Sequence, residues 1–134
     1  MLPYYGVFDH LQFRVDGDRV ILEGQVTRPV LKDDAGNVVK RIEGVREVRN
    51  NIEVLPLSRF DDEIRIREYR AIFSQAPLSR YAMGADPSIH IIVDNGHVTL
   101  VGVVNNQVDA SMAKLAANTV PGVFSVTNNL RVGS

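Results

Sequence analysis

The sequence contains two copies of one pattern, separated by a constant offset of 78 residues without a gap. Residues 11–26 align with residues 89–104 and share the motif V-x-L-x-G-x-V, which stands at 20–26 and at 98–104. The register holds after a divergent middle part, where G-V-x-x-V-x-N-x-[IL]-x-V recurs at 44–54 and 122–132. Catalysis requires only a few scattered side chains, whereas constant spacing over whole segments is typical of a repeated fold. The sequence therefore predicts two units of the same architecture.

The repeat divides the chain into a first unit, residues 1–56, and a second unit, residues 57–134. Each unit is near the lower size limit of a domain with its own core, so contact between units or with a partner is expected to matter. The chain is 45% hydrophobic, which excludes a disordered protein, and it has no apolar run of membrane-spanning length. It has no cysteine, which excludes disulfides and thiolate metal sites.

Charge is distributed unevenly between the two units. Residues 9–55 contain nine acidic and eight basic side chains, whereas residues 87–132 contain two of each. Neither unit has a basic surplus, which argues against a nucleic-acid partner. The repeated part of the second unit, residues 87–132, is thus far less charged than that of the first.

Hydrophobic alternation predicts a β-hairpin at the start of each unit, with turns at residues 16–18 and 94–96. A helix capped by Thr27, with Pro29 in its first turn, follows the first hairpin, and a helix from Asn105 or Asn106 to about Thr119 follows the second. Third strands are expected at 45–54 and 123–132. We expect the core stripes of these helices to be Leu31, Ala35, Val38 and Ile42 in the first and Val108, Met112, Leu115 and Thr119 in the second.

A further helix, at about 61–76, precedes the hairpin of the second unit. Its expected cap is Asp61 or Asp62, and its expected apolar face is Ile66, Tyr69, Ile72, Phe73 and Ala76. The predicted fold class is α+β, with small mixed three-stranded sheets covered by helices on one face. The order is helix, strand, strand, helix, strand, and the first unit lacks its leading helix.

The two motifs resemble those of the BON domain, the module named after bacterial osmotically inducible and nodulation proteins. Both halves of the signature occur in order in both copies, which cover nearly the whole chain. The resemblance implies tandem α/β sandwiches, a periplasmic or cell-envelope setting in a bacterium, and no catalytic residues, cofactor or metal. It also implies a role at phospholipid surfaces or in envelope integrity under osmotic stress.

Several polar residues have the types that chemistry uses, but their spacing favours structural roles. The histidines, His10, His90 and His97, lack a metal-ligand partner at short spacing, and we expect them at surface or loop positions. Asp61, Asp62 and Glu63 match the preference of a helix N-terminus for acidic residues. Gly24 and Gly102 are expected to admit a close helix or a β-bulge, and Gly44 and Gly122 to end the helices before them. We expect Asn50 and Asn128 to satisfy an edge or bulge of the third strand through side-chain hydrogen bonds, with a ligand site as the alternative.

The outward face of the second hairpin differs most from its repeat. Ile92, Val101 and Val103 stand at positions that are arginine, glutamate and glutamine in the first unit. An apolar second side of a sheet indicates that this side is also covered. Small residues on the following helix, opposite its expected core stripe, would let another element approach closely: Ala110, Ala113 and Ala117.

Three occupants of this interaction face stay open: the first unit of the same chain, a protein partner or second copy, and a lipid surface. We expect a non-enzymatic binding or assembly module that self-associates as a homo-oligomer or fibre, or binds an envelope protein. The alternative is a periplasmic adaptor at phospholipid surfaces in stress protection.

The missing leading helix leaves the apolar side of the first hairpin to be covered by something else. The helix after Thr27 alone, the aromatic stub Tyr4, Tyr5 and Phe8 folding back, or an element of another molecule would close this space. We expect Phe13 to be buried and Tyr4, Tyr5 or Phe8 to contribute to covering it, within the chain or between chains. Leaving a large apolar side chain in water forgoes about 1.5–3 kcal/mol.

Overall fold

The computed structural model describes residues 6–82 and 87–133. The chain divides into two compact units, and each is described by itself. The first comprises residues 9–56, and the second comprises residues 57–134 together with Gly6–Phe8. Tyr4 and Tyr5 lie outside the described residues.

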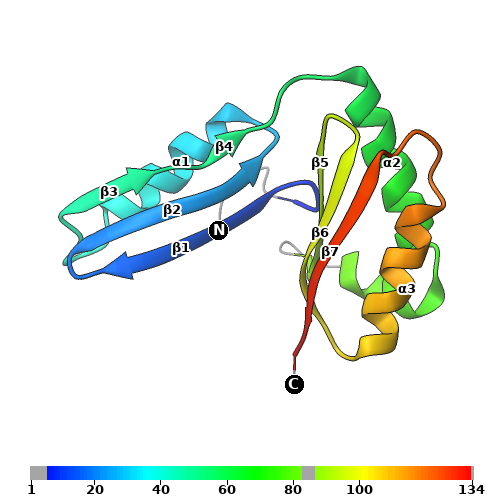
Figure 1. The fold of residues 1–134 in the computed structure, drawn as a ribbon. Helices are drawn as coiled ribbons and strands as arrows, with labels where there is room; N and C mark the ends of the chain where they lie inside the picture. The colour runs from blue at the N-terminus through cyan, green and yellow to red at the C-terminus, as the bar shows by residue number, and fades with distance from the viewer. Residues whose placement is uncertain (1–5, 83–86, 134) are drawn as a thin grey trace. The chain divides into compact units, whose positions relative to one another are not determined.

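In the first unit, β1 (His10–Asp16) and β2 (Arg19–Val26) form an antiparallel hairpin. The helix α1 (Pro29–Lys40) returns the chain so that β3 (Glu47–Asn50) and β4 (Glu53–Val54) pair with β2 in parallel. The helix covers one face of the sheet (Figure 1). The core between them consists of Val20, Leu22, Val26, Leu31, Ala35 and Ile52.

The start of α1 differs from the sequence prediction. Arg28, not Thr27, is the N-cap residue, and it makes no side-chain capping bond. Thr27 instead donates from its backbone N and from Oγ1 to the Asp9 carboxylate, at 2.7 and 2.8 Å. The Thr27 hydroxyl therefore ties the first strand region to the helix start, which left it unavailable as a cap.

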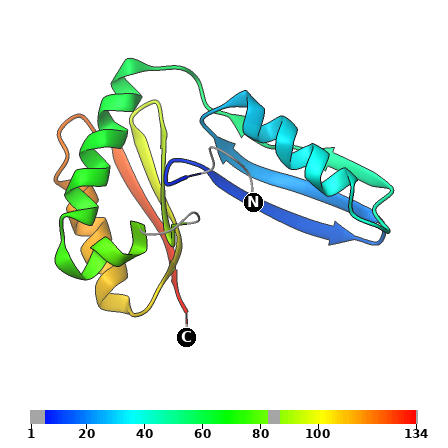
Figure 2. The ribbon, with the colours of Figure 1, turned by 180° about the vertical axis from the view of Figure 1, so that it is seen from behind.

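The second unit begins with α2 (Arg59–Phe73) and the 3₁₀ helix η1 (Ala76–Ala82). The strands β5 (Ile89–Asp94) and β6 (His97–Val104) are antiparallel, and β7 (Ser125–Val132) is parallel to β6 after the helix α3 (Gln107–Asn118). Both long helices pack on the same face of the sheet (Figure 2). The predicted α+β class, with two small mixed sheets, is confirmed.

The buried side of α3 is opposite to the side that the sequence predicted. Ala110, Ala113 and Ala117 are at most 2% exposed and belong to the core, whereas Val108 and Leu115 are 68% and 69% exposed. Alanine side chains let the helix axis approach the sheet closely, and this outweighs the larger transfer energy of valine and leucine. In α1 the predicted stripe is confirmed for Leu31 and Ala35, which are buried, and wrong for Val38 and Ile42, which are exposed.

The buried face of α2 was predicted only in part, since Ile72 is buried and Phe73 packs against the core as expected. Ile64, Glu68 and Ile72 form its central stripe, each within 1% of full burial, while Ile66 and Tyr69 are exposed. Glu68 lies in the middle of this buried stripe, and a stripe is recognised in a sequence by regularly spaced apolar residues. The sequence analysis therefore missed it. The helix is capped by Ser58, whose Oγ accepts from the Asp61 backbone N, rather than by Asp61 or Asp62.

The segment just before β1 packs against the second unit. The Ile91 backbone N donates to the Val7 carbonyl at 2.7 Å, and the Phe8 ring lies 6.4 Å from that of Tyr69. Phe8 therefore does not cover Phe13, which is 68% exposed. The expectation that Phe13 is buried within the chain was wrong, because the free edge of β5 binds the segment that was expected to fold back.

Candidate interaction surfaces

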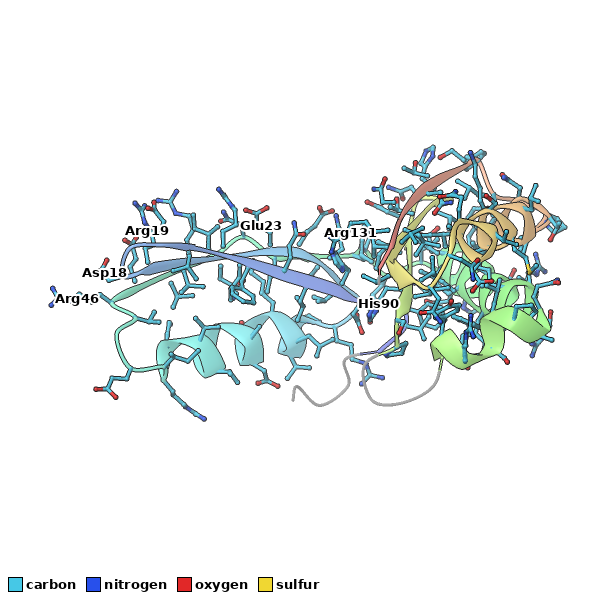
Figure 3. All side chains as sticks on the ribbon, turned by 90° about the horizontal axis from the view of Figure 1, so that it is seen from below. Asp18, Arg19, Glu23, Arg46, His90 and Arg131 are labelled. Carbon is cyan, nitrogen blue, oxygen red and sulfur yellow. The ribbon has the colours of Figure 1, made fainter. Side chains whose placement is uncertain are left out.

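The outer face of the first sheet is charged. Arg14 pairs with Glu23 at 2.9 Å, and Arg19 lies 3.4 Å from Asp16 and 3.9 Å from Glu47. Figure 3 shows Arg19 and Glu23 on the side of the sheet away from α1. These exposed pairs leave the face close to neutral and well hydrated, so it offers little apolar contact to a partner.

The predicted interaction face of the second sheet occupies the equivalent side. Ile92 is 5% exposed, Val101 is half-buried, and Val103 is 43% exposed. Whether a partner binds there stays a prediction. The alanines that were assigned to a second part of this face lie instead inside the unit, so Ala110, Ala113 and Ala117 cannot form an accessible surface.

The exposed face of α3 carries an apolar stripe in their place. Val108 and Leu115 are exposed and Met112 is half-buried, and with Gln107 and Ser111 they line a shallow surface hollow. The corresponding positions of α1 are Val30, Asp34 and Asn37. The stripe is therefore a feature of the second unit alone.

The repeated asparagines make equivalent hydrogen bonds in both units. Asn50 Nδ2 donates to the Lys32 carbonyl at 2.7 Å, and Asn128 Nδ2 donates to the equivalent Ala110 carbonyl at 3.0 Å. In each case the amide oxygen also accepts from the backbone N two residues later. The amides thus connect the last strand of each unit to its helix.

The repeated glycines stand where a side chain would not fit or where φ is positive. Gly24 and Gly102 have φ of 124° and 132°, and a Cβ atom there would overlap the carbonyl oxygen of His10 in β1 and that of Ser88 just before β5. The close approach is to a strand backbone and not to a helix. Gly44 and Gly122, in the loops after α1 and α3, have φ of 93° and 90°.

The histidines do not converge. His90, which was expected at the surface or in a loop, is a buried strand residue whose Nδ1 lies 2.9 Å from the Gly6 carbonyl oxygen. His97 is exposed, with Nδ1 2.7 Å from Ser125 Oγ. His10 is half-buried in β1. Within residues 6–82 and 87–133, no three histidine or carboxylate side chains are grouped as a metal ion would require.

The acidic start of α2 anchors the helix to the β5–β6 turn. The two Asp61 carboxylate oxygens accept from the backbone N of Asn95 and of Gly96, both at 2.9 Å. Asp62 pairs with Arg65 at 2.6 Å, and Arg65 Nη2 also donates to the Val93 carbonyl at 2.9 Å. These carboxylates are thus committed to the fold.

The sequence analysis missed a buried polar cluster at the start of α3. Asp109 accepts from the Tyr81 hydroxyl at 2.5 Å and from Arg80 at 2.8 Å. The hydrogen bond from Tyr81, followed by that from Arg80, lowers the pKa of Asp109 below its usual value. Asn106 at the cap, with an acid three residues later, was the available signal for a structural Asp109.

Glu68 was also missed. It is fully buried, and no described residue donates a hydrogen bond to either carboxylate oxygen. Desolvation by burial raises the pKa of Glu68 to about 8. No sequence signal separates it from the exposed charges around it on α2.

The geometry defines a class of protein with two α/β units in tandem. The polar clusters described above form hydrogen bonds within each unit, and the surfaces that distinguish the units are apolar. The chain belongs to the BON domain family, whose pattern matches residues 6–56 and 76–134. The predicted family membership is confirmed.

Two curated proteins are similar to this chain. It is 33% identical over 110 residues to the outer membrane lipoprotein DolP of Haemophilus influenzae, a match that covers 81% of this chain and 55% of the relative. It is 30% identical over 126 residues to osmotically-inducible protein Y of Escherichia coli, with 90% of this chain and 61% of the relative covered. The chain thus spans little more than half the length of these relatives.

A solved structure is similar at a lower level. The C-terminal domain of CdsD, the structural protein of the type III secretion system of Chlamydia trachomatis, aligns with 96% of this chain and 92% of its own. The identity is 12% and the TM-score is 0.36. Among the described residues, none of the helices combines the length and the apolar character needed to cross a membrane.

Proposed function

We propose that this chain is a non-enzymatic binding and assembly module of a bacterial cell envelope, which self-associates through the apolar surface of its second unit. Membership in the BON family and the names of the two bacterial relatives support the envelope setting. The structural commitments of Asp61, Asp109 and Asn128 support a role without catalysis, since these polar groups bind the protein itself.

The observation that carries the self-association is the exposed stripe of α3. Val108 and Leu115 present aliphatic side chains to solvent, and Leu115 has a polar counterpart, Asn37, in the first unit. Contiguous exposed apolar residues on one unit of a repeat are typical of an interaction site. The outer sheet residues Val101 and Val103 extend the apolar character to the other side of the same unit.

Two substitutions transfer the polarity of the first unit to the second. Leu115→Asn and Val101→Glu place there the residues that the repeat has at positions 37 and 23. We expect each to lower the mean mass measured by light scattering over a dilution series, because burying a polar or charged group at an interface is costly. Lys114→Glu, at an exposed position beside Leu115, is the control and should leave the mass unchanged.

A parent chain that is monomeric at every concentration would contradict the self-association. A mass that falls equally in Lys114→Glu would show that charge, and not the apolar surface, controls assembly. Hydrogen exchange of each variant should match the parent within the core strands, so that a lower mass reflects the interface and not unfolding.

A further inference from the structure

The first unit has an open apolar groove at the place where the second unit holds α2. The groove lies between β1 and α1 and is lined mainly by aliphatic and aromatic side chains: Leu11, Gln12, Phe13, Leu22, Ala35, Val38, Val39 and Ile52. No helix among the described residues covers it. Each lining residue has a counterpart 78 residues later in the core of the second unit or packed against it, except Gln12.

The difference in exposure between the two units is large. Phe13 and Val15 are 68% and 65% exposed, while their counterparts Ile91 and Val93 are fully buried. In the second unit the covering side chains are Ile64 and Ile72 of α2, in the same core cluster as Ile91 and Val93. A unit of this size gains about 25 cal/mol for each Å² of apolar surface removed from water, so covering the groove is favourable.

The second unit shows in which direction a helix would lie in this groove. Figures 1 and 2 show α2 and α3 of the second unit running in opposite directions, so a helix in the equivalent place would run opposite to α1. Its N-terminus would lie near the C-terminal part of α1, where Val38 and Val39 line the groove.

We propose that this groove is the docking site for one amphipathic α-helix of a protein partner, with aliphatic residues spaced as Ile64 and Ile72 are on α2. The α2 helix buries these two side chains in the second unit, in one core cluster with the counterparts of the groove residues. The inference stands independently of the proposed self-association, which uses the second unit.

A peptide of residues 57–75, with a fluorescent label and blocked termini, is the probe, and the whole chain is the receptor. The chain's own α2 is tethered beside its site at a high effective concentration, so the peptide should not displace it. We expect saturable one-to-one binding by anisotropy, with hydrogen exchange slowed in residues 10–16 and in α1. Two peptide variants test the orientation: Ile64→Glu should abolish binding, whereas Ile66→Glu, on the exposed face of α2, should not.

Receptor variants test the groove itself. Val38→Glu, which lines the groove, should weaken binding by at least about tenfold. Val30→Glu is the matched control, since Val30 is a valine of similar exposure on the same helix but outside the groove. Phe13→Glu provides a second test on the opposite wall, and its exposed position should let the variant fold.

Several results would overturn the proposal. They are an absence of saturable binding, equal effects of Val38→Glu and Val30→Glu, and slowed exchange confined to residues 89–104. A parent chain that is dimeric and becomes monomeric in Val38→Glu would show that a second copy covers the groove. If neutral phosphatidylcholine vesicles compete with the peptide for the parent chain, and Val38→Glu abolishes vesicle binding, the occupant of the groove is a lipid. Binding only when the peptide is fused ahead of residue 1 would indicate a helix acting within one chain and not a partner.

Discussion

At the scale of single residues, Glu68 combines full burial with the absence of any hydrogen-bond donor among the described residues. Its position between Ile64 and Ile72 puts a carboxyl group in the apolar contact of α2 with the sheet. Burial disfavours the charged form, and a pKa of about 8 means that the folded protein holds the proton at neutral pH. The contact between α2 and the sheet therefore includes a carboxyl group that is protonated at neutral pH.

This residue predicts a pH dependence of stability. The pKa rises from 4.5 in the unfolded chain to about 8 in the folded one, so the neutral acid stabilises fully below pH 4.5 and this contribution is lost as pH rises through 8. We expect the free energy of unfolding to fall by up to about 1.4 kcal/mol for each pH unit in that window. Glu68→Gln should remove this slope in denaturant titrations, and Glu63→Gln, at an exposed position of α2, should retain it. A slope that survives in Glu68→Gln would contradict the assignment.

Equivalent backbone groups are satisfied by different side chains in the two units. The Thr27 backbone N donates to Asp9, and its counterpart, the Asn105 backbone N, donates to the Tyr81 hydroxyl at 3.0 Å. Both contacts hold the loop between the second strand and its helix. Each unit therefore supplies a hydrogen-bond acceptor to this backbone N–H, but from a different residue.

At the scale of elements, the strands β2 and β6 depend on the close approach at Gly24 and Gly102. A side chain at either position meets a carbonyl oxygen of the preceding strand region, and the positive φ adds strain. Because each glycine belongs to one unit, the two substitutions provide controls for each other.

Gly102→Ala should destabilise the second unit by about 2 kcal/mol or more, and Gly24→Ala should do the same to the first. Hydrogen exchange resolved along the chain is the measurement. Residues 89–104 should exchange faster in Gly102→Ala while residues 10–26 stay at the parent rate, and Gly24→Ala should show the reverse. Unchanged exchange in both variants would mean that the strands shift apart without cost.

At the scale of the whole molecule, charge is balanced locally as well as in total. The net charge is −1, and Arg14, Arg19 and Arg46 each lie within 4.0 Å of a carboxylate of the same unit. Attraction to an anionic membrane needs unpaired basic residues near the surface. The arginines on the outer face of the first sheet are therefore paired within the protein, which weakens their attraction to an anionic membrane.

We expect weak co-sedimentation with anionic vesicles and little change with salt. The double variant Glu23→Gln and Glu47→Gln removes the carboxylate beside Arg14 and one of the two beside Arg19, and it should bind more strongly and in a salt-sensitive way. Strong, salt-sensitive binding by the parent chain would instead favour the phospholipid adaptor over the self-associating module.

The repeat, the hairpins with their turns, the order of the α-helices and strands, and the family could all be predicted from the sequence. These features depend on local spacing, on turn residues such as Asn95 and Gly96, and on motifs that recur at a constant offset. They are encoded within short stretches of chain, and no knowledge of distant contacts is needed to recognise them.

Only the tertiary structure decided which side of each helix is buried and where the segment Gly6–Phe8 lies. Hydrophobic periodicity favoured Val108 and Leu115 on α3, but close packing against the sheet selected the alanines instead. Glu68 lies in the core because hydrogen bonds of Asp61 and Arg65 to the β5–β6 hairpin fix which side of α2 faces the sheet. The open groove of the first unit follows from the same cause, since the burial of Phe13 depends on a covering helix and not on its own strand.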